Sequence, residues 1–345
     1  MRVDLHTHIL PRSWPDLRER YGYGGWVRLE HEPDGCSARM LIDDRSFRSV
    51  GANAWDPAVR LEEADRHGVD MQVLSTVPVM FGYWAKPDDT ADLARLLNEH
   101  LAGVVRDHPT RFAGLGTVPL QAPDLAVAEL ERCVRELGLP GVQIGTHANG
   151  MNLGDAALFP FFEAAQDLGA AVFVHPWDMM GGDRLQRYWM RWLVGMPAET
   201  ATAMCSVLFA GVMERLPDLR IGFAHGGGSF PGTIGRIQHG FDVRPDLCAT
   251  DTSLAPRHHL AGDHGPARMY VDSLVHDADM LRHVLTLFGP DRVALGTDYP
   301  FPLGETEPGA LIRSLGLDPE AERLVLGGTA LQFLGLPVPA PAGGA

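Results

Sequence analysis

Residues 3–8 read VDLHTH and open the first of eight short apolar or β-branched runs, which alternate along the chain with longer helical patterns. This alternation is typical of repeated strand–helix units in a parallel sheet. Eight such units in 345 residues favour a closed (β/α)8 barrel of the TIM type with an insertion, because a barrel alone needs about 250 residues. The eight strands are expected at residues 3–7, 71–77, 112–118, 141–144, 171–174, 220–224, 267–272 and 293–296.

Helices are expected between these strands and favour the same architecture. A doubly wound open sheet is the alternative arrangement of parallel strands, but no GxGxxG motif follows the first strand. The clearest helical patterns lie at residues 88–107, 124–137, 159–168, 199–215 and 279–287.

The segment 12–56 interrupts the alternation. It is rich in Gly, Trp and Arg, reads YGYGGW at residues 21–26, and has short alternating pieces around Gly35. We expect a small β-hairpin subdomain here, inserted after the first strand and lying over one mouth of the barrel. Residues 1–335, with this insertion, are predicted to form a single domain. Residues 336–345 consist mostly of Pro, Ala and Gly and are predicted to be a disordered tail, because they offer too little apolar bulk to pack.

The composition is that of a soluble globular protein with an acidic surface. Asp and Glu number 44 against 29 Lys and Arg, a formal net charge of −15, which argues against nucleic acid and anionic membranes as partners. We find no apolar run of about 18 residues and no signal-peptide pattern, so a cytoplasmic protein is expected. The four cysteines stand far apart without a CxxC pair, which argues against a disulfide framework or a thiolate zinc site.

His6 and His8 on the first strand are the first candidate metal ligands. Side chains at positions i and i+2 of a strand point to the same face, about 6.6 Å apart, so two imidazoles there can converge on one ion. A barrel interior is normally packed with aliphatic side chains, and two histidines in it need polar partners. From this motif alone, a pair of hydrogen-bonded core histidines remains the alternative.

Three more ionisable side chains follow strands in the same way. His175 comes after the fifth strand, His225 after the sixth and Asp298 after the eighth. The C-terminal ends of barrel strands share one rim, so all five residues are expected to meet there. His147 and His276 are weaker candidates for the same site. The other histidines are expected on the surface or on helices: His31, His67, His100, His108, His239, His258, His259, His264 and His283.

These motifs resemble the metal-dependent amidohydrolase superfamily and, within it, the aminocarboxymuconate semialdehyde decarboxylase family. The resemblance runs nearly end to end. Its first and last motifs fit the whole superfamily, and the middle ones are specific to the decarboxylases. The motifs are DLHTHILP at 4–11, LSTVPVMF at 74–81, GVQIGTH at 141–147, FVHPWDM at 173–179, AHGGG at 224–228 and GTDYPFP at 296–302.

The resemblance implies a zinc site with one ion per subunit. Its ligands would be His6, His8, His175 and Asp298, and His225 would be the catalytic base near the water on the metal. Such a ligand set leaves room for a water, whose pKa a bound Zn2+ lowers toward about 7, and a histidine titrates in the range needed to take that proton. Two-metal members use a carboxylated lysine at the end of strand four. Here that strand ends QIG, so a single metal is predicted.

The resemblance also implies a substrate, 2-amino-3-carboxymuconate 6-semialdehyde, and its non-oxidative decarboxylation to 2-aminomuconate 6-semialdehyde and CO2 in tryptophan–kynurenine or nitroaromatic catabolism. Arg48 matches a substrate-binding arginine, and Arg236 matches one delivered across a homodimer interface. A guanidinium about 4 Å from a carboxylate contributes about 4 kcal/mol at an effective dielectric near 20, so it outweighs the screened net charge. Without the resemblance, either arginine reads as an ordinary solvated side chain.

Four apolar side chains match positions on the pocket wall of that family, although aromatic residues in barrels are usually core packing. They are Phe47, Met179, Trp192 and Phe301. Segment 251–269 is several residues longer than the family pattern and is expected to loop outward, which weakens the inference about Arg236.

Other functions remain open at this point, because a fold and a metal do not fix the reaction. A zinc hydrolase of a lactone or cyclic amide and a related hydroxybenzoate decarboxylase are the enzymatic alternatives. A non-catalytic metal-binding protein is the alternative from another class. Ions such as Co2+ also suit a nitrogen and oxygen ligand set, so the sequence indicates no more than a preference for zinc.

Overall fold

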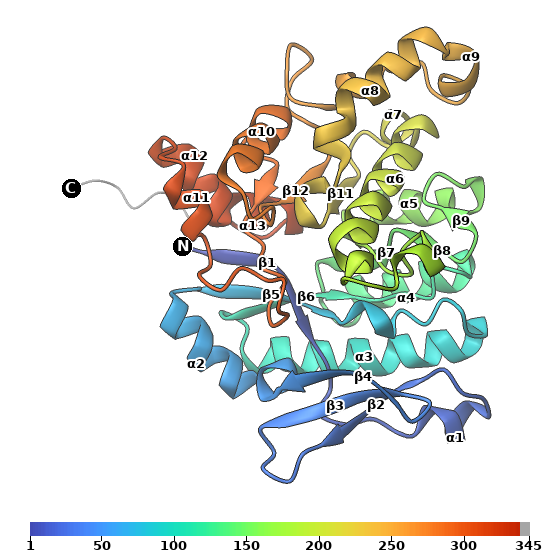
Figure 1. The fold of residues 1–345 in the computed structure, drawn as a ribbon, viewed down its shortest axis with the longest axis vertical. Helices are drawn as coiled ribbons and strands as arrows, with labels where there is room; N and C mark the ends of the chain where they lie inside the picture. The colour runs from blue at the N-terminus through green and yellow to red at the C-terminus, as the bar shows by residue number, and fades with distance from the viewer. Residues whose placement is uncertain (339–345) are drawn as a thin grey trace.

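A computed structural model describes residues 1–338 and contains an eight-stranded parallel barrel (Figure 1). Neighbouring strands pair in sequence order, and each connection carries at least one helix or a short helical turn. The predicted (β/α)8 architecture is therefore confirmed. The barrel strands are β1 (Val3–Ile9), β5 (Met71–Thr76), β6 (Phe112–Gly116), β7 (Gly141–Gly145), β10 (Ala171–His175), β11 (Arg220–Phe223), β12 (Tyr270–Asp272) and β13 (Val293–Ala294).

Backbone hydrogen bonds between β1 and the chain around β13 close the barrel. The Leu5 N–H donates to the Leu295 carbonyl at 2.8 Å. Above it, the Asp298 N–H donates to the His6 carbonyl and the His8 N–H donates to the Tyr299 carbonyl, both at 2.8 Å. The closing seam therefore runs through the residues that were predicted to bind metal.

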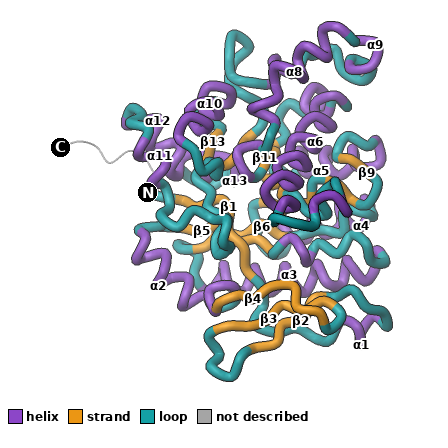
Figure 2. The backbone as a smooth tube through the Cα atoms, in the orientation of Figure 1, coloured by secondary structure: helices purple, strands orange, loops and turns teal. Residues whose placement is uncertain are grey.

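Helices cover the outside of the barrel (Figure 2). Many of them begin with proline in the first turn, where the missing N–H leaves no hydrogen bond unmade. The expected helix over 199–215 is broken, because Gly211 adopts a left-handed φ of 67° and a Cβ there would lie 2.7 Å from the Asp251 carbonyl oxygen. The covering helices are α2 (Pro57–His67), α3 (Pro87–Asp107), α4 (Pro123–Arg135), α5 (Phe159–Asp167), α6 (Met196–Phe209), α7 (Val212–Arg215), α8 (Phe230–Val243) and α10 (Ala278–Phe288).

The end of the barrel opposite the histidines is filled by α13 (Thr329–Leu334). Phe333 is fully buried there, with its ring centroid 5.1 Å from that of Tyr270 and 6.4 Å from that of Phe173. Leu331 and Leu334 of the same helix join this cluster together with inward-facing side chains of the strands. The barrel is therefore a packed core at one end and presents its polar residues at the other.

The insertion after β1 forms a three-stranded antiparallel sheet rather than the predicted hairpin. Its strands are β2 (Val27–His31), β3 (Ser37–Ile42) and β4 (Arg45–Gly51), preceded by α1 (Leu17–Tyr21). Asp43 and Asp44 connect β3 to β4, both with positive φ, as a tight two-residue hairpin turn requires. The sheet packs against α3 and lies at the bottom of Figure 1, so the third strand extends the insertion toward the barrel mouth.

Three further predictions have mixed outcomes. In segment 251–269, residues 262–266 are exposed as predicted, while Leu260 and Ala267 are buried. His259, expected on the surface or a helix, ends the short 3-10 helix η7 (Pro256–His259) and is 1% exposed. The predicted tail at 336–345 lies largely outside the described residues, and Leu336 packs against the barrel core.

One helical stretch among residues 1–338, Arg191–Phe209, is apolar and long enough by composition to cross a membrane. It comprises a π-helical turn and α6, and 39% of its apolar window is buried in the protein. Met204, Val207 and Leu208 of this stretch belong to the main hydrophobic core. Part of its apolar surface therefore packs in the core of the protein.

Burial of His259 predicts a pH-dependent loss of stability. Burial and the positive charge of Arg268 lower the pKa of His259 to about 4, whereas an unfolded chain takes up the proton near 6.5. The unfolded state binds more protons below pH 6.5, so stability falls as the pH drops from 6.5 to about 4, by up to about 3 kcal/mol. His259→Phe should flatten this part of a urea-denaturation profile, whereas His67→Phe, at an exposed site, should not. Equal slopes in the wild type and in His259→Phe would contradict the prediction.

Candidate active site

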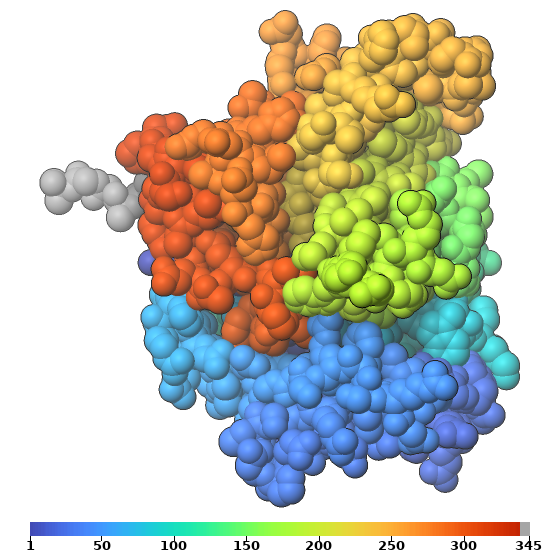
Figure 3. Space-filling view, viewed as in Figure 1, coloured from blue at the N-terminus to red at the C-terminus, as the bar shows by residue number. Residues whose placement is uncertain are grey.

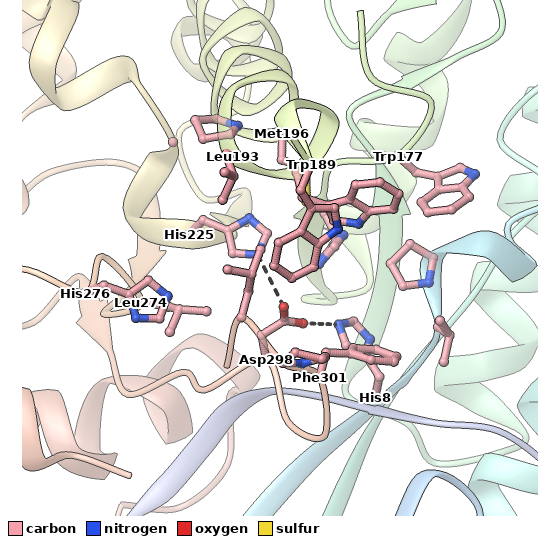
Figure 4. Close-up of a pocket in the computed structure, with 18 of the residues that line it drawn as sticks. His8, Trp177, Trp189, Leu193, Met196, His225, Leu274, His276, Asp298 and Phe301 are labelled. Carbon is pink, nitrogen blue, oxygen red and sulfur yellow. Dashed lines mark ion pairs between the residues drawn. The ribbon is translucent and has the colours of Figure 1, made fainter. Parts of the chain in front are cut away.

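Four segments bring the five predicted polar side chains together at the C-terminal rim of the barrel. Figure 4 labels three of them, His8, His225 and Asp298. His6 and His8 lie on β1, His175 ends β10, His225 follows β11 and Asp298 follows β13. The Nε2 atoms of His6 and His8 are 3.2 Å apart. Asp298 Oδ1 lies 3.0 Å from His8 Nε2 and 3.4 Å from His6 Nε2, and Asp298 Oδ2 lies 3.9 Å from His225 Nε2.

The hydrogen bonds of three imidazoles orient their Nε2 atoms as acceptors. Each Nδ1 lies within 3.1 Å of an oxygen that accepts its proton: Asp272 Oδ2 for His6, the Thr76 carbonyl for His8 and the Pro176 carbonyl for His175. Since a neutral imidazole carries one proton, the Nε2 atoms are left with lone pairs. His175 Nε2 is buried without a hydrogen-bond partner among residues 1–338. These lone pairs and the Asp298 carboxylate face one another and need a cation between them.

This donor set fits a divalent metal ion. His6, His175, His225 and Asp298 each offer a ligand atom, and these atoms all lie within 4.8 Å of one another. His8 is outside that group of four but close to His6 and Asp298. Imidazole nitrogens with one carboxylate oxygen are ligands typical of Zn2+ and of similar transition metals.

The charge states of His8, His175 and Asp298 at neutral pH suit metal binding. Burial holds the pKa of His175 well below its usual range and lowers that of His8, so both rings are neutral. Burial alone would raise the pKa of Asp298, but its contacts with His225 and His8 hold it well below the usual value. Burial would also lower the pKa of His6, yet the bond to Asp272 and the Asp298 charge raise it. The negative charges of Asp272 and Asp298 therefore favour a positive charge beside His6.

The backbone at the rim is held in uncommon conformations. His225 and Asp298 have φ of 58° and 57°, in the left-handed region that costs a non-glycine residue roughly 1–3 kcal/mol. Gly226 follows with φ of 61°, and a Cβ there would lie 2.3 Å from Val275 Cγ1. The glycine run 226–228 thus lets the chain turn sharply beside His225, and glycine is required at the turn.

A cavity of about 320 Å³ opens above the metal-binding atoms. Its wall includes the insertion, the stretch around residues 177–197, residues 274–280 and the loop after Asp298. The first two of these and the loop after Asp298 meet in the middle of the face shown in Figure 3. Phe47, Trp192 and Phe301 line it, and His8, His175, His225 and Asp298 form its polar base. Further lining side chains include Trp177, Trp189, Leu193, Met196, Leu274 and His276.

Arg48 is the cationic side chain of this cavity. Its guanidinium carbon lies 4.5 Å from the Phe301 ring centroid and 5.3 Å from that of Phe47. Burial lowers its pKa from the ordinary value, but an arginine remains charged at neutral pH. No carboxylate within residues 1–338 forms an ion pair with it, so this charge faces an apolar cavity and is free to bind an anionic ligand.

The comparisons with known proteins match this geometry. The amidohydrolase family model covers residues 3–336. A 2-amino-3-carboxymuconate-6-semialdehyde decarboxylase from Dictyostelium discoideum is 57% identical over 97% of this chain and 92% of its own. The chain belongs to the amidohydrolase family. Within that family, this identity places it beside the 2-amino-3-carboxymuconate-6-semialdehyde decarboxylases.

Solved structures of other decarboxylases share the fold of this amidohydrolase. A 5-carboxyvanillate decarboxylase from Sphingomonas paucimobilis superposes with a TM-score of 0.75 at 28% identity, covering 83% of this chain and 85% of its own. A dihydroxybenzoic acid decarboxylase from Polaromonas sp. JS666, solved with bound manganese and an inhibitor, gives a TM-score of 0.73 at 21% identity, covering 97% and 96%. At that identity the second likeness concerns the fold alone.

The structure does not bring every predicted site residue to the cavity. Met179 is buried behind the wall, with its Cβ 3.0 Å from the position of a Cβ on Gly195, and it does not line the cavity. Arg236 lies on the exposed side of α8, away from the cavity of its own chain. His147 is also elsewhere, because both its ring nitrogens are bonded to backbone carbonyls.

Two buried charged residues behind the site escaped the sequence analysis. Asp272 accepts the hydrogen bond from His6, and Arg60 donates to the His8 carbonyl at 2.6 Å and to Thr7 Oγ1 at 3.0 Å. Both are 0% exposed. An acidic residue at the end of an apolar strand was the available signal for Asp272. The helical position of Arg60 gave no comparable signal.

Metal analysis tests the donor set directly. The metal-loaded protein should contain one divalent ion per chain. His175→Ala should weaken its affinity by more than the roughly 10- to 100-fold that follows loss of a hydrogen-bond partner behind a ligand. His147→Ala is the matched control, since that histidine is bonded to backbone carbonyls outside the site. Two ions per chain, or equal affinity in wild type and His175→Ala, would contradict this assignment.

Proposed function

We propose that this amidohydrolase catalyses the non-oxidative decarboxylation of 2-amino-3-carboxymuconate 6-semialdehyde to 2-aminomuconate 6-semialdehyde and CO2, with one zinc ion per subunit. The observation that carries the proposal is the set of imidazole Nε2 atoms and one carboxylate around a common point, beneath a cavity with an unpaired arginine. The identity to a decarboxylase of that name supports the choice of substrate. The cytoplasmic location and the catabolic pathway remain predictions from the sequence.

His6, His8, His175 and Asp298 would hold the metal. The ring hydrogen bonds described above orient three of these ligands, and the buried, unpartnered Nε2 of His175 supports this assignment. A bound divalent ion supplies Lewis acidity and lowers the pKa of water toward neutrality.

His225 is proposed to carry the proton that the reaction needs. Decarboxylation replaces one C–C bond of a double-bonded carbon with a C–H bond, so that carbon must gain one proton. His225 Nε2 faces Asp298 on the cavity wall, and His225 Nδ1 has no hydrogen-bond partner within residues 1–338. The ring can therefore take a proton from water at Nε2 and deliver it to the carboxylate-bearing carbon, while the hydroxide left behind adds to the other carbon of the double bond. When CO2 then leaves, the electron pair of the broken C–C bond re-forms the double bond and expels the hydroxide, so no vinyl carbanion forms.

Arg48 is proposed to orient the substrate by one of its carboxylates. The guanidinium is held between two aromatic rings, so it loses little conformational freedom when it pairs with an anion. The surrounding aromatic and aliphatic wall excludes water, which strengthens this interaction. Phe47, Trp192 and Phe301 thus serve as wall contacts, whereas Met179 would support the wall from behind.

A second arginine is proposed to come from the other subunit of a homodimer. The substrate has two carboxylates, and Arg236 lies outside the cavity of its own chain on the exposed side of α8. In Figure 1, α8 and α9 (Pro245–Cys248) extend away from the barrel, in a position to contact a neighbouring copy. This arrangement gives each site one arginine from each chain.

Substrate turnover tests the reaction and the role of His225. Wild-type enzyme should consume 2-amino-3-carboxymuconate 6-semialdehyde with release of CO2. His225→Ala should lose about 100- to 10,000-fold in kcat, as expected for removal of an acid–base group, and should keep its metal. Loss of metal together with activity would instead make His225 a ligand. Faster turnover of 5-carboxyvanillate, or hydrolysis of a lactone without CO2 release, would favour the alternative functions.

Co-expression of two inactive variants tests the role of Arg236. Arg236→Ala chains keep their own His225, and His225→Ala chains still supply Arg236, so each variant alone should be inactive. Random pairing makes half of the dimers mixed, each with one complete site, and should restore about one quarter of wild-type activity per site. Differently tagged chains allow the mixed dimer to be purified and assayed. An inactive mixed dimer, or a monomeric active enzyme, would contradict the proposal.

A further inference from the structure

Asp272 links two parts of the proposed site through one buried carboxylate. Its Oδ2 accepts the Nδ1–H of His6 at 2.7 Å and the backbone N–H of His225 at 2.9 Å. Its Oδ1 accepts the backbone N–H groups of Gly226 at 2.7 Å and Leu274 at 3.1 Å. The carboxylate is fully buried, and both oxygens are engaged by donors.

The first consequence concerns the tautomer of His6. Three backbone N–H groups, which can only donate, point at the two Asp272 oxygens, so the carboxylate acts as an acceptor and the proton between it and His6 belongs to His6 Nδ1. His6 Nε2 is then left with the lone pair that a metal ion requires.

His6 differs here from the other histidine ligands. His8 and His175 donate their Nδ1 protons to the backbone carbonyls of Thr76 and Pro176, which no substitution at those positions removes. Ser75 Oγ also lies 3.2 Å from His8 Nδ1, but the Thr76 carbonyl accepts that proton without it, so among these three rings it is His6 whose tautomer depends on a side chain.

The second consequence concerns the position of His225. The same Oδ2 atom holds its backbone N–H, and Oδ1 holds the next N–H along the chain. Both residues are in the left-handed region, which is costly for a histidine and persists only when neighbouring groups hold it. One carboxylate therefore holds both a ligand of the metal and the turn that presents the base.

We propose that Asp272 is a positioning residue that fixes the metal-binding tautomer of His6 and, through the same carboxylate, the place of His225. This inference rests on the proposed metal-dependent function and concerns a residue that touches neither substrate nor metal.

Neither close replacement of Asp272 preserves these contacts. Asparagine offers one acceptor oxygen for four donors, so its NH2 group faces either the His6 and His225 donors or those of Gly226 and Leu274. If the NH2 group faces His6 and His225, two donors meet, and this clash is relieved at His6 only if its proton moves from Nδ1 to Nε2. Nε2 then has no lone pair for the metal. Glutamate does not fit, because a Cβ on Gly296 would already lie 2.7 Å from the Asp272 Cβ.

Asp272→Asn tests the proposal in the full-length enzyme. With zinc as the probe, its metal affinity measured by chelator competition should fall about 10- to 100-fold. At saturating zinc, kcat should fall while KM changes little, because Arg48 and the cavity wall are untouched. Glu129→Gln is the matched control: Glu129 is a buried carboxylate that pairs with Arg132 between α3 and α4, so it should lose stability but keep its zinc affinity and kcat.

Nitrogen-15 NMR of the histidine rings provides a readout that does not depend on the variant folding. In zinc-loaded wild type, His6 should carry its proton on Nδ1 and show the shift of a metal-bound nitrogen at Nε2. Zinc at Nδ1, or unchanged zinc affinity and kcat in Asp272→Asn, would overturn the proposal. These outcomes are separate from the choice of substrate: wild type that binds zinc but does not release CO2 would refute the proposed reaction and leave the assignment of Asp272 intact.

Discussion

Closure of the barrel between β1 and the chain after β13 is the constraint on which the site depends. The seam is made by backbone groups, with Leu5 bonded to Leu295 and Asp298 bonded to His6, each at 2.8 Å. It brings together the two ends of a long stretch of sequence and sets the carboxylate of Asp298 within 3.4 Å of the imidazole of His6. Closure of the barrel therefore brings the ligands together. No additional loop is needed to place their side chains side by side.

Most of the architecture could be predicted from the sequence because it follows from periodic patterns. Buried strands alternate with amphipathic helices eight times, and each repeat indicates the same fold. Features that depend on single residues were harder to infer. The third strand of the insertion depends on a tight turn at Asp43 and Asp44, and the break after α6 depends on the left-handed conformation of Gly211. Neither changes the hydrophobic pattern around it.

The same distinction applies to the candidate site. Polar residues at the C-terminal ends of apolar strands, such as His175 and Asp298, interrupt a pattern that would otherwise be apolar, and the sequence therefore reveals them. Arg60 is hidden because a charged residue on a surface helix is ordinary until the fold shows that it is fully buried. Met179 lies next to a cavity-lining segment, but its side chain is buried. The sequence pattern does not indicate whether a side chain at such a position faces the cavity or the core.

The helix that fills the far end of the barrel limits how molecules can reach the cavity. With Phe333 buried among strand side chains, molecules cannot pass along the barrel axis. Ligands therefore reach the cavity from the rim of the barrel, where Trp189 and Leu193 line it with side chains that are 43% and 52% exposed.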